Sequence, residues 1–191
     1  MIKNHDDSKT MLGFWIYIMT DCVLFASLFA AFAVLHNSTY GGPQGIDIFS
    51  LPFVLTETLI LLTSSFTCGL AILAAHGQNK QRVVLWLVVT ALLGVSFLTM
   101  EFTEFRHLVN ENNSWQRSSF LSAFFTLVGT HGLYITSGLI WMMTMIVRVI
   151  KHDLLTPTVR QLTLMSIFWH FLDIVWIFIF TVVYLLGVIQ V

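Results

Sequence analysis

Five long apolar runs divide this chain of 191 residues. They occupy approximately residues 11–36, 51–76, 83–107, 119–148 and 161–189. A transmembrane helix needs about 20 mainly apolar residues, and each run exceeds that length. The chain is 57% hydrophobic and 10% charged, whereas a soluble domain carries about 25% charged residues. We therefore predict an all-α polytopic membrane protein, a bundle of five transmembrane helices that forms one domain over residues 1–191.

The connectors between the runs are short, and their basic residues are unevenly distributed. Residues 41–45, in the first connector, are rich in glycine and proline and do not sustain a helix. Two basic residues, Arg106 and Arg117, fall on one side of the predicted membrane. Seven fall on the other side: Lys3, Lys9, Lys80, Arg82, Arg148, Lys151 and Arg160. The positive-inside rule then predicts a cytoplasmic N-terminus and a periplasmic C-terminus. A net charge of −1 gives no reason to expect a nucleic-acid partner.

Every apolar run contains an ionisable residue, although such groups are costly in the hydrocarbon core. His170 and Asp173 are three residues apart within the segment 169–176, so they share one helical face. At about 1.5 Å per residue from the predicted run ends, Asp21, His131 and His170 lie at a similar depth. We expect a polar belt across the bundle interior. The candidate functional residues are Asp21, Glu57, Glu101, Glu104, His131, His170 and Asp173.

Three interpretations of the intramembrane histidines, His131 and His170, are open. Two histidines at one depth could hold a haem or another iron centre. The polar groups could instead relay protons across the membrane, or each could form a hydrogen bond that joins two helices. The chain has no clustered Cys and His spacing of the kind found in metal sites. Gly132 and Gly138 near His131 allow close helix approach, so the residues by themselves favour hydrogen bonding between helices.

The carboxyl groups also allow more than one interpretation. Glu57 has no Lys or Arg in its run, so we expect an uncharged acid that donates one hydrogen bond. A functional proton acceptor is the alternative for Glu57. Glu101 and Glu104 lie at the end of the third run beside Arg106. These three residues are expected to form an interfacial charge cluster that anchors the helix.

Several segments, taken in order, resemble subunit III of haem–copper respiratory oxidases. The resemblance is greatest to the five-span form of bacterial bo-type ubiquinol oxidases. The matching segments cover all five runs: residues 12–17 with Asp21, the segment around Glu57, residues 101–104, residues 129–138 and residues 168–176. Tyr134 departs from the family pattern, because many members have a second histidine at this position. Position 134 is therefore not expected to be a ligand.

The resemblance implies a non-catalytic accessory subunit of a proton-pumping ubiquinol oxidase in a bacterial inner membrane. Such a complex oxidises ubiquinol and reduces oxygen to water. The resemblance also implies that this chain has no catalytic centre and no cofactor, with haems and copper in catalytic subunit I. Phospholipid and the other oxidase subunits are the expected partners, and stabilising the catalytic subunit and its lipid and proton-uptake surroundings is the expected role. Two alternatives stay open: a small transmembrane haem protein using His131 and His170, and a free-standing proton or solute transporter.

Overall fold

The computed structural model of the chain describes residues 3–36, 51–110, 118–151 and 154–185. Five helices in these ranges are long and apolar enough to cross a membrane. They are α1 (Lys3–Leu35), α3 (Leu51–His76), α4 (Lys80–Asn110), α5 (Ser119–Lys151) and α6 (Thr156–Ile179), which continues as a π-helix, η1 (Phe180–Leu185). No β-strand occurs in the described ranges. The predicted all-helical class with five spans is confirmed, whereas residues 41–45 and Arg117 lie outside the described residues.

The helices extend beyond the apolar runs from which they were predicted. α4 begins at Lys80 and ends at Asn110, three residues outside the predicted run at each end. Backbone hydrogen bonding continues into the polar ends, so hydropathy marks only the apolar part of each helix. Capping sets two of the starts. The side chain of Asn79 accepts a hydrogen bond from the backbone N–H of Arg82 at 3.2 Å, and Pro157 occupies the first turn of α6, where a missing N–H costs nothing.

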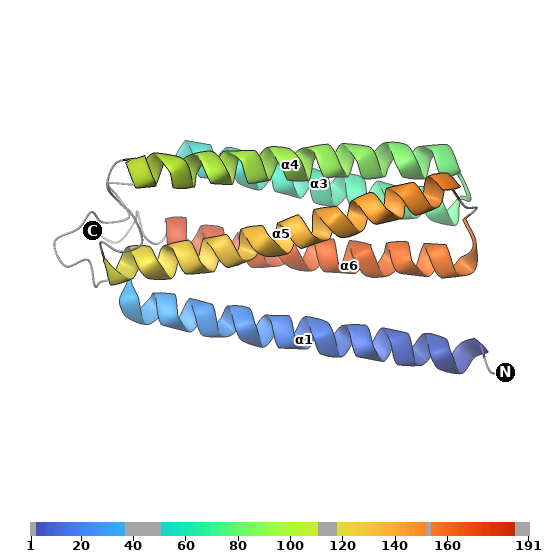
Figure 1. The fold of residues 1–191 in the computed structure, drawn as a ribbon, viewed down its shortest axis with the longest axis horizontal. Coiled ribbons are helices and arrows are strands. Elements are labelled where there is room, and N and C mark those ends of the chain that lie inside the picture. The colour runs from blue at the N-terminus through green and yellow to red at the C-terminus, as the bar shows by residue number, and fades with distance from the viewer. Residues whose placement is uncertain (1–2, 37–50, 111–117, 152–153, 186–191) are drawn as a thin grey trace.

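Four helices form a closed ring, and α1 packs on its outside. Within the ring α3 contacts α4, α4 contacts α5, α5 contacts α6, and α6 contacts α3. Consequently α4 and α6 lie diagonally across the ring. α1 lies along α5 and touches α6 less extensively, and Figure 1 shows it as a separate layer below the other helices. The start of α1 and the end of η1 lie at opposite ends of the bundle (Figure 1), as an odd number of passes requires.

Large aromatic side chains fill the ring, and two glycines make room for them. Trp169 and Trp176 of α6 are fully buried, and the ring of Phe97 meets Trp176 edge-on with 4.6 Å between centroids. A Cβ atom at Gly94 of α4 would lie 2.9 Å from the Trp169 side chain, and one at Gly138 of α5 would lie 3.1 Å from it. Neither position accepts a side chain unless the indole moves. The predicted role of Gly138 in close helix approach is confirmed.

Candidate functional site: polar groups inside the helix bundle

The candidate residues gather in three places rather than in one belt. The first is the contact of Asp21 with Tyr134, between α1 and α5. The second lies inside the ring toward η1, and we call it the buried carboxyl cluster: Glu57, Glu101, Glu104, His131 and Tyr184. The third lies on the surface of the ring where α3 meets α6, and we call it the His170 patch: Ser65, Gly69, His170 and Asp173.

Asp21 connects α1 to the ring. Its side chain is buried, and the hydroxyl of Tyr134 donates a hydrogen bond to Oδ1 with 2.9 Å between the oxygen atoms. The ring of Phe25, one turn further along α1, packs against Tyr134 with 5.3 Å between centroids. Sequence reasoning set Tyr134 aside as a non-ligand and missed this bond. The available signal was its position three residues after His131, which puts both side chains on one face of α5.

Three carboxyl groups come together in the buried carboxyl cluster. Glu57 of α3 and Glu101 of α4 are buried, and Glu57 interacts electrostatically with Glu101 and Glu104. A Cβ atom at Gly132 of α5 would lie 2.9 Å from Oε1 of Glu101, so the glycine makes room for the carboxyl group. Tyr184 donates a hydrogen bond to Oε2 of Glu104 at 2.9 Å. The cluster therefore draws on α3, α4, α5 and η1.

Glu101 and Glu104 differ from the interfacial anchor expected from the sequence. Both side chains point into the ring, where they meet Gly132 and Tyr184, while Arg106 is exposed. The physical reason is the length of α4. It continues to Asn110, so the two acids lie well inside the helix rather than at its end.

Tyr184 reaches this cluster because the last part of the fifth span is irregular. α6 is α-helical to Ile179, and η1 then follows as a π-helix of six residues. A π-helical turn holds more residues than an α-helical one, so the side chains along it are rotated about the axis relative to an α-helix. Tyr184 is fully buried, with its ring 5.8 Å from that of Phe124. Sequence reasoning did not single out Tyr184.

Aromatic rings enclose His131 completely. Its side chain is 0% exposed, and its ring stacks on Trp176 with 5.2 Å between centroids. Phe97 meets the same imidazole edge-on at 6.1 Å. Neither ring nitrogen has a hydrogen-bond partner among the described residues. The indole N–H of Trp176 donates instead to the hydroxyl of Thr58 on α3, at 3.1 Å. His131 is therefore held by packing.

His131 and His170 do not lie opposite each other. In the antiparallel pair α5 and α6, His131 stacks on Trp176, which is six residues beyond His170 and so about 9 Å further along the helix. The expected common depth was wrong because α5 continues for 20 residues beyond His131 to Lys151, whereas only 14 residues separate the start of α6 at Thr156 from His170. The two histidines thus lack the geometry of a haem clamp. Across the described ranges, no three His, Cys, Asp or Glu side chains are placed to share a metal ion.

His170 lies where α6 meets α3, and its side chain is 43% exposed. Its Nδ1 atom is hydrogen-bonded to the hydroxyl of Ser65 and lies 3.8 Å from Oδ2 of Asp173, too far for a hydrogen bond. Asp173 is 5% exposed, and neither of its carboxyl oxygens has a hydrogen-bond partner in the described part of the chain. The fold brings the pair together with Ser65, which the sequence alone did not single out.

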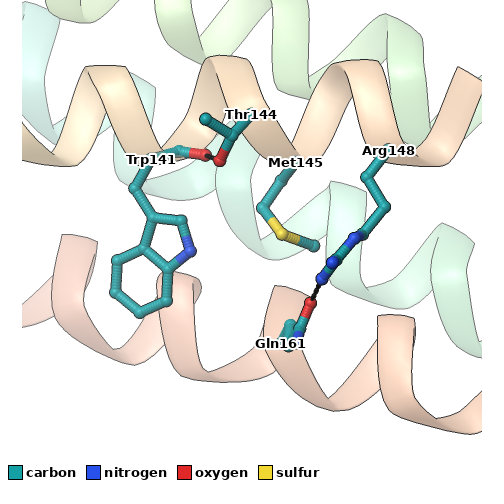
Figure 2. A pocket seen from close by; sticks show the side chains of 5 residues that line it. All are labelled: Trp141, Thr144, Met145, Arg148 and Gln161. Carbon is teal, nitrogen blue, oxygen red and sulfur yellow. Dashed lines mark hydrogen bonds between the residues drawn. The ribbon is translucent and has the colours of Figure 1, made fainter.

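A cavity of about 390 Å³ opens between α5 and α6 near the end of α5. It is lined by Trp141, Thr144, Met145, Arg148 and Gln161. Figure 2 shows Arg148 reaching across from α5, where its guanidinium donates a hydrogen bond to the side-chain oxygen of Gln161 on α6. The indole of Trp141 and the thioether of Met145 supply apolar walls. The cavity therefore combines one cation with apolar surface, near a helix end.

Five apolar helices with ionisable groups packed between them define the class, a multi-pass helical membrane protein. The family described as cytochrome c oxidase subunit III matches residues 5–188. A protein named cytochrome bo(3) ubiquinol oxidase subunit 3 from Pseudomonas putida is 57% identical, with 96% of this chain and 89% of that protein covered. Its namesake from Pseudomonas aeruginosa is 54% identical, with 96% and 88% covered. A cytochrome c oxidase subunit 3 from a Bacillus species is 43% identical, with 96% and 89% covered.

The chain therefore belongs to the cytochrome c oxidase subunit III family. This membership confirms the resemblance found in the sequence. Together with the five apolar helices, it makes the chain a multi-pass protein of the bacterial inner membrane. It also makes the chain one subunit of a multi-subunit oxidase assembly.

Proposed function

We propose that this chain is the accessory third subunit of a proton-pumping terminal ubiquinol oxidase, in which another subunit carries the haems and copper. The observation that carries the proposal is the 57% identity, over 96% of the chain, to a protein named as a ubiquinol oxidase subunit 3. On this proposal residues 1–191 form a single domain without a catalytic centre. The domain stabilises the catalytic subunit and its lipid and proton-uptake surroundings.

The geometry of the polar groups supports an accessory role. Several of them join helices, as Tyr134 joins Asp21 and Tyr184 joins Glu104, while His131 is enclosed by aromatic rings. Interhelical hydrogen bonds in membranes contribute about 0.6 kcal/mol each on average. The proposed role is structural or proton-related, without ligation of a cofactor, for all seven candidates: Asp21, Glu57, Glu101, Glu104, His131, His170 and Asp173.

The electron donor is the second part of the proposal. Relatives named for ubiquinol are 57% and 54% identical to this chain, and the relative named for cytochrome c is 43% identical. The higher identities favour ubiquinol. A complex purified through this chain should consume oxygen with a ubiquinol analogue and not with reduced cytochrome c. The opposite preference would assign the chain to a cytochrome c oxidase.

The proposed orientation has the N-terminus in the cytoplasm and the C-terminus in the periplasm. Four basic residues lie where α4 begins and α5 ends, at one end of the bundle: Lys80, Arg82, Arg148 and Lys151. Basic residues gather on the cytoplasmic side of membrane proteins. A cysteine introduced at the exposed Asn79 should react with a membrane-impermeant thiol reagent only after the inner membrane is opened. Labelling in intact spheroplasts would reverse the orientation.

The proposed phospholipid partner suits the cavity at Arg148. A guanidinium can hold a phosphate group through two parallel hydrogen bonds, and Trp is enriched at the level of lipid headgroups. The phosphate would bind to Arg148, with acyl chains along the apolar walls. Arg148→Leu should lower the number of phospholipids retained per purified complex, as counted by native mass spectrometry. Lys151→Leu, at the exposed end of the same helix, is the matched control, and an equal lipid count in both variants would contradict the assignment.

Purification through a tag on this chain, combined with optical spectra, tests the accessory role itself. The chain should co-purify with larger, haem-containing subunits, and the chain alone should show no Soret band. A haem stoichiometric with the isolated chain would establish the small haem protein instead. Proton or solute transport by liposomes that contain only this chain would establish the transporter. Either result would overturn the proposed function.

A further inference from the structure

His170 is an exposed polar group in the middle of a membrane span. It follows the start of the fifth span, Thr156–Leu185, by 14 residues and so lies about 21 Å from that end of the helix. Its side chain is nevertheless 43% exposed on the surface of the ring. Ionisable groups at such depth almost always face a protein interior or a water-filled cavity, because lipid offers them no hydrogen bond. The chain by itself leaves this histidine incompletely covered.

The orientation of the His170 imidazole shows which of its two nitrogen atoms is directed away from this chain. Nδ1 is turned inward, toward the hydroxyl of Ser65 and the carboxyl group of Asp173. Nε2 is the other nitrogen of the imidazole, and it therefore faces the exposed surface of the bundle. The neighbouring surface side chains are apolar, with Phe66 67% and Ile174 54% exposed. Nε2 is thus a polar point in an apolar surface, and the buried Asp173 behind it also lacks a hydrogen-bond partner in the described residues.

The adjacent surface of α3 leaves room for another helix. Gly69 follows Ser65 by four residues, which places both on the same face of α3. A Cβ atom at Gly69 would meet nothing within 4 Å. Small residues at such a position let the backbone of a second transmembrane helix approach closely. The exposed Nε2 of His170 and the open space at Gly69 therefore lie on the same surface of the bundle.

We propose that the His170 patch is the surface on which a transmembrane helix of the catalytic oxidase subunit docks. That helix carries a hydroxyl or amide side chain that hydrogen-bonds to Nε2 of His170. Both groups can donate and accept, so either tautomer of the imidazole is satisfied. The inference rests on the proposed function, because that function supplies the partner. The docked helix covers His170 as Trp176 and Phe97 cover His131.

Other occupants fit the patch less well. An acyl chain covers the surface but provides no hydrogen bond. A second copy of this chain, related by a two-fold axis, would set one patch against another, and the two imidazoles could hydrogen-bond only if they held different tautomers, which breaks the symmetry. A helix from a different subunit can present the complementary group. Hydrogen-bond complementarity therefore favours a hetero-oligomeric contact.

Photo-crosslinking in the intact oxidase in its native membrane tests the inference. A photoreactive amino acid is placed at Phe66 or Ile174, on the two helices that form the patch. The matched control is Leu92 on α4, which is 65% exposed and lies across the ring from α6. The first two probes should form a covalent product with the catalytic subunit, and Leu92 should not. A product with that subunit from Leu92 alone, or products with lipid or a second copy alone, would overturn the inference.

Retention of the chain in the purified complex provides an independent measurement. His170→Leu should weaken retention on detergent washing by about 3- to 20-fold, as expected for one lost interhelical hydrogen bond. His170→Gln can still form that bond and should restore most of the retention. Thr90→Val is the control, since it removes a hydrogen bond to Thr67 inside the ring, where the two hydroxyl oxygens are 2.8 Å apart. Equal losses in His170→Leu and Thr90→Val would show that the patch has no docking role.

Failure of this inference is distinguishable from failure of the proposed function. If the chain co-purifies with a haem-containing oxidase but crosslinks only from α4, the docking surface is wrong and the accessory role stands. If the unmodified chain does not co-purify with any oxidase subunit, the proposed function fails, and the docking surface fails with it.

Discussion

His131 and His170 are equivalent in the sequence and different in the fold. Each is the one histidine of a long apolar helix, and the two helices are packed against each other. His131 is 0% exposed, and its ring is stacked on Trp176. His170 is 43% exposed, and only its Nδ1 atom is turned toward this chain. The buried carboxyl cluster is therefore closed by its own bundle, whereas the His170 patch depends on something outside it.

The difference arises from the neighbours that each histidine meets. Around His131, aromatic side chains arrive from α4 and α6, and Gly132 leaves room for the carboxyl group of Glu101. Around His170, the neighbouring helix offers the small residues Ser65 and Gly69, which leave one side of the imidazole open. A buried histidine without hydrogen bonds reports on packing inside a subunit. A half-exposed histidine at membrane depth reports on assembly.

The largest effect on stability is expected when the aromatic enclosure of His131 is removed. Trp176→Ala removes the ring that stacks on His131 and the hydrogen bond to Thr58, and should destabilise the subunit by about 3–5 kcal/mol. Thermal denaturation of the purified complex and the amount of chain it contains measure this effect. Trp15→Ala is the control, because Trp15 is 45% exposed on α1. Normal assembly and melting of Trp176→Ala would show that the enclosure contributes little.

The second prediction compares the two regions directly. His170→Leu removes the polar group that the patch presents to the docked helix, and should weaken retention of the chain by about 0.5–2 kcal/mol. His131→Leu should leave retention unchanged and cost less than about 1.5 kcal/mol of stability, since no hydrogen bond from this ring is lost. Quantitative immunoblotting of detergent-washed complex measures both variants. A larger retention loss for His131→Leu than for His170→Leu would reverse the comparison.

The third prediction concerns the π-helical end of the fifth span. Tyr184→Phe removes the hydrogen bond to Glu104, and should cost about 0.6 kcal/mol because interhelical bonds in membranes are weak. The rate of thermal inactivation of the complex measures the loss. A double-mutant cycle with Glu104→Leu isolates the pair, and the coupling energy should be close to the loss in Tyr184→Phe. Fully additive effects would mean that the bond does not contribute.

The smallest effect is expected at Glu57. Neither carboxyl oxygen of this residue has a hydrogen-bond partner among the described residues, and Gln has almost the same shape. Glu57→Gln should therefore leave the initial rate of quinol oxidation nearly intact in an assembled complex. Oxygen consumption measured in the first seconds after quinol addition tests this. A large immediate loss of turnover with normal assembly would make Glu57 part of the reaction path and contradict the accessory role.

Much of the fold could be predicted because a continuous apolar run in the sequence is enough to identify each membrane helix. The apolar runs identified all five spans, and small residues predicted the close crossing at Gly138. The contacts of the candidate site were less predictable. Tyr134 is the partner of Asp21, and its only local signal was its place on the His131 face of α5. Tyr184 is the partner of Glu104, and its run contains no polar neighbour that indicates this bond.

By itself the sequence determined the membrane class, the five spans, the family and the presence of costly polar groups. The cost of placing an ionisable group in lipid is a property of that residue and its run, so hydropathy detects it. Only the tertiary structure decided how each group is accommodated. The register and rotation of the helices are set where Gly94 and Gly138 close around Trp169. That packing is non-local, and it determines that His131 is enclosed while His170 and Asp173 lie at a surface that a partner can cover.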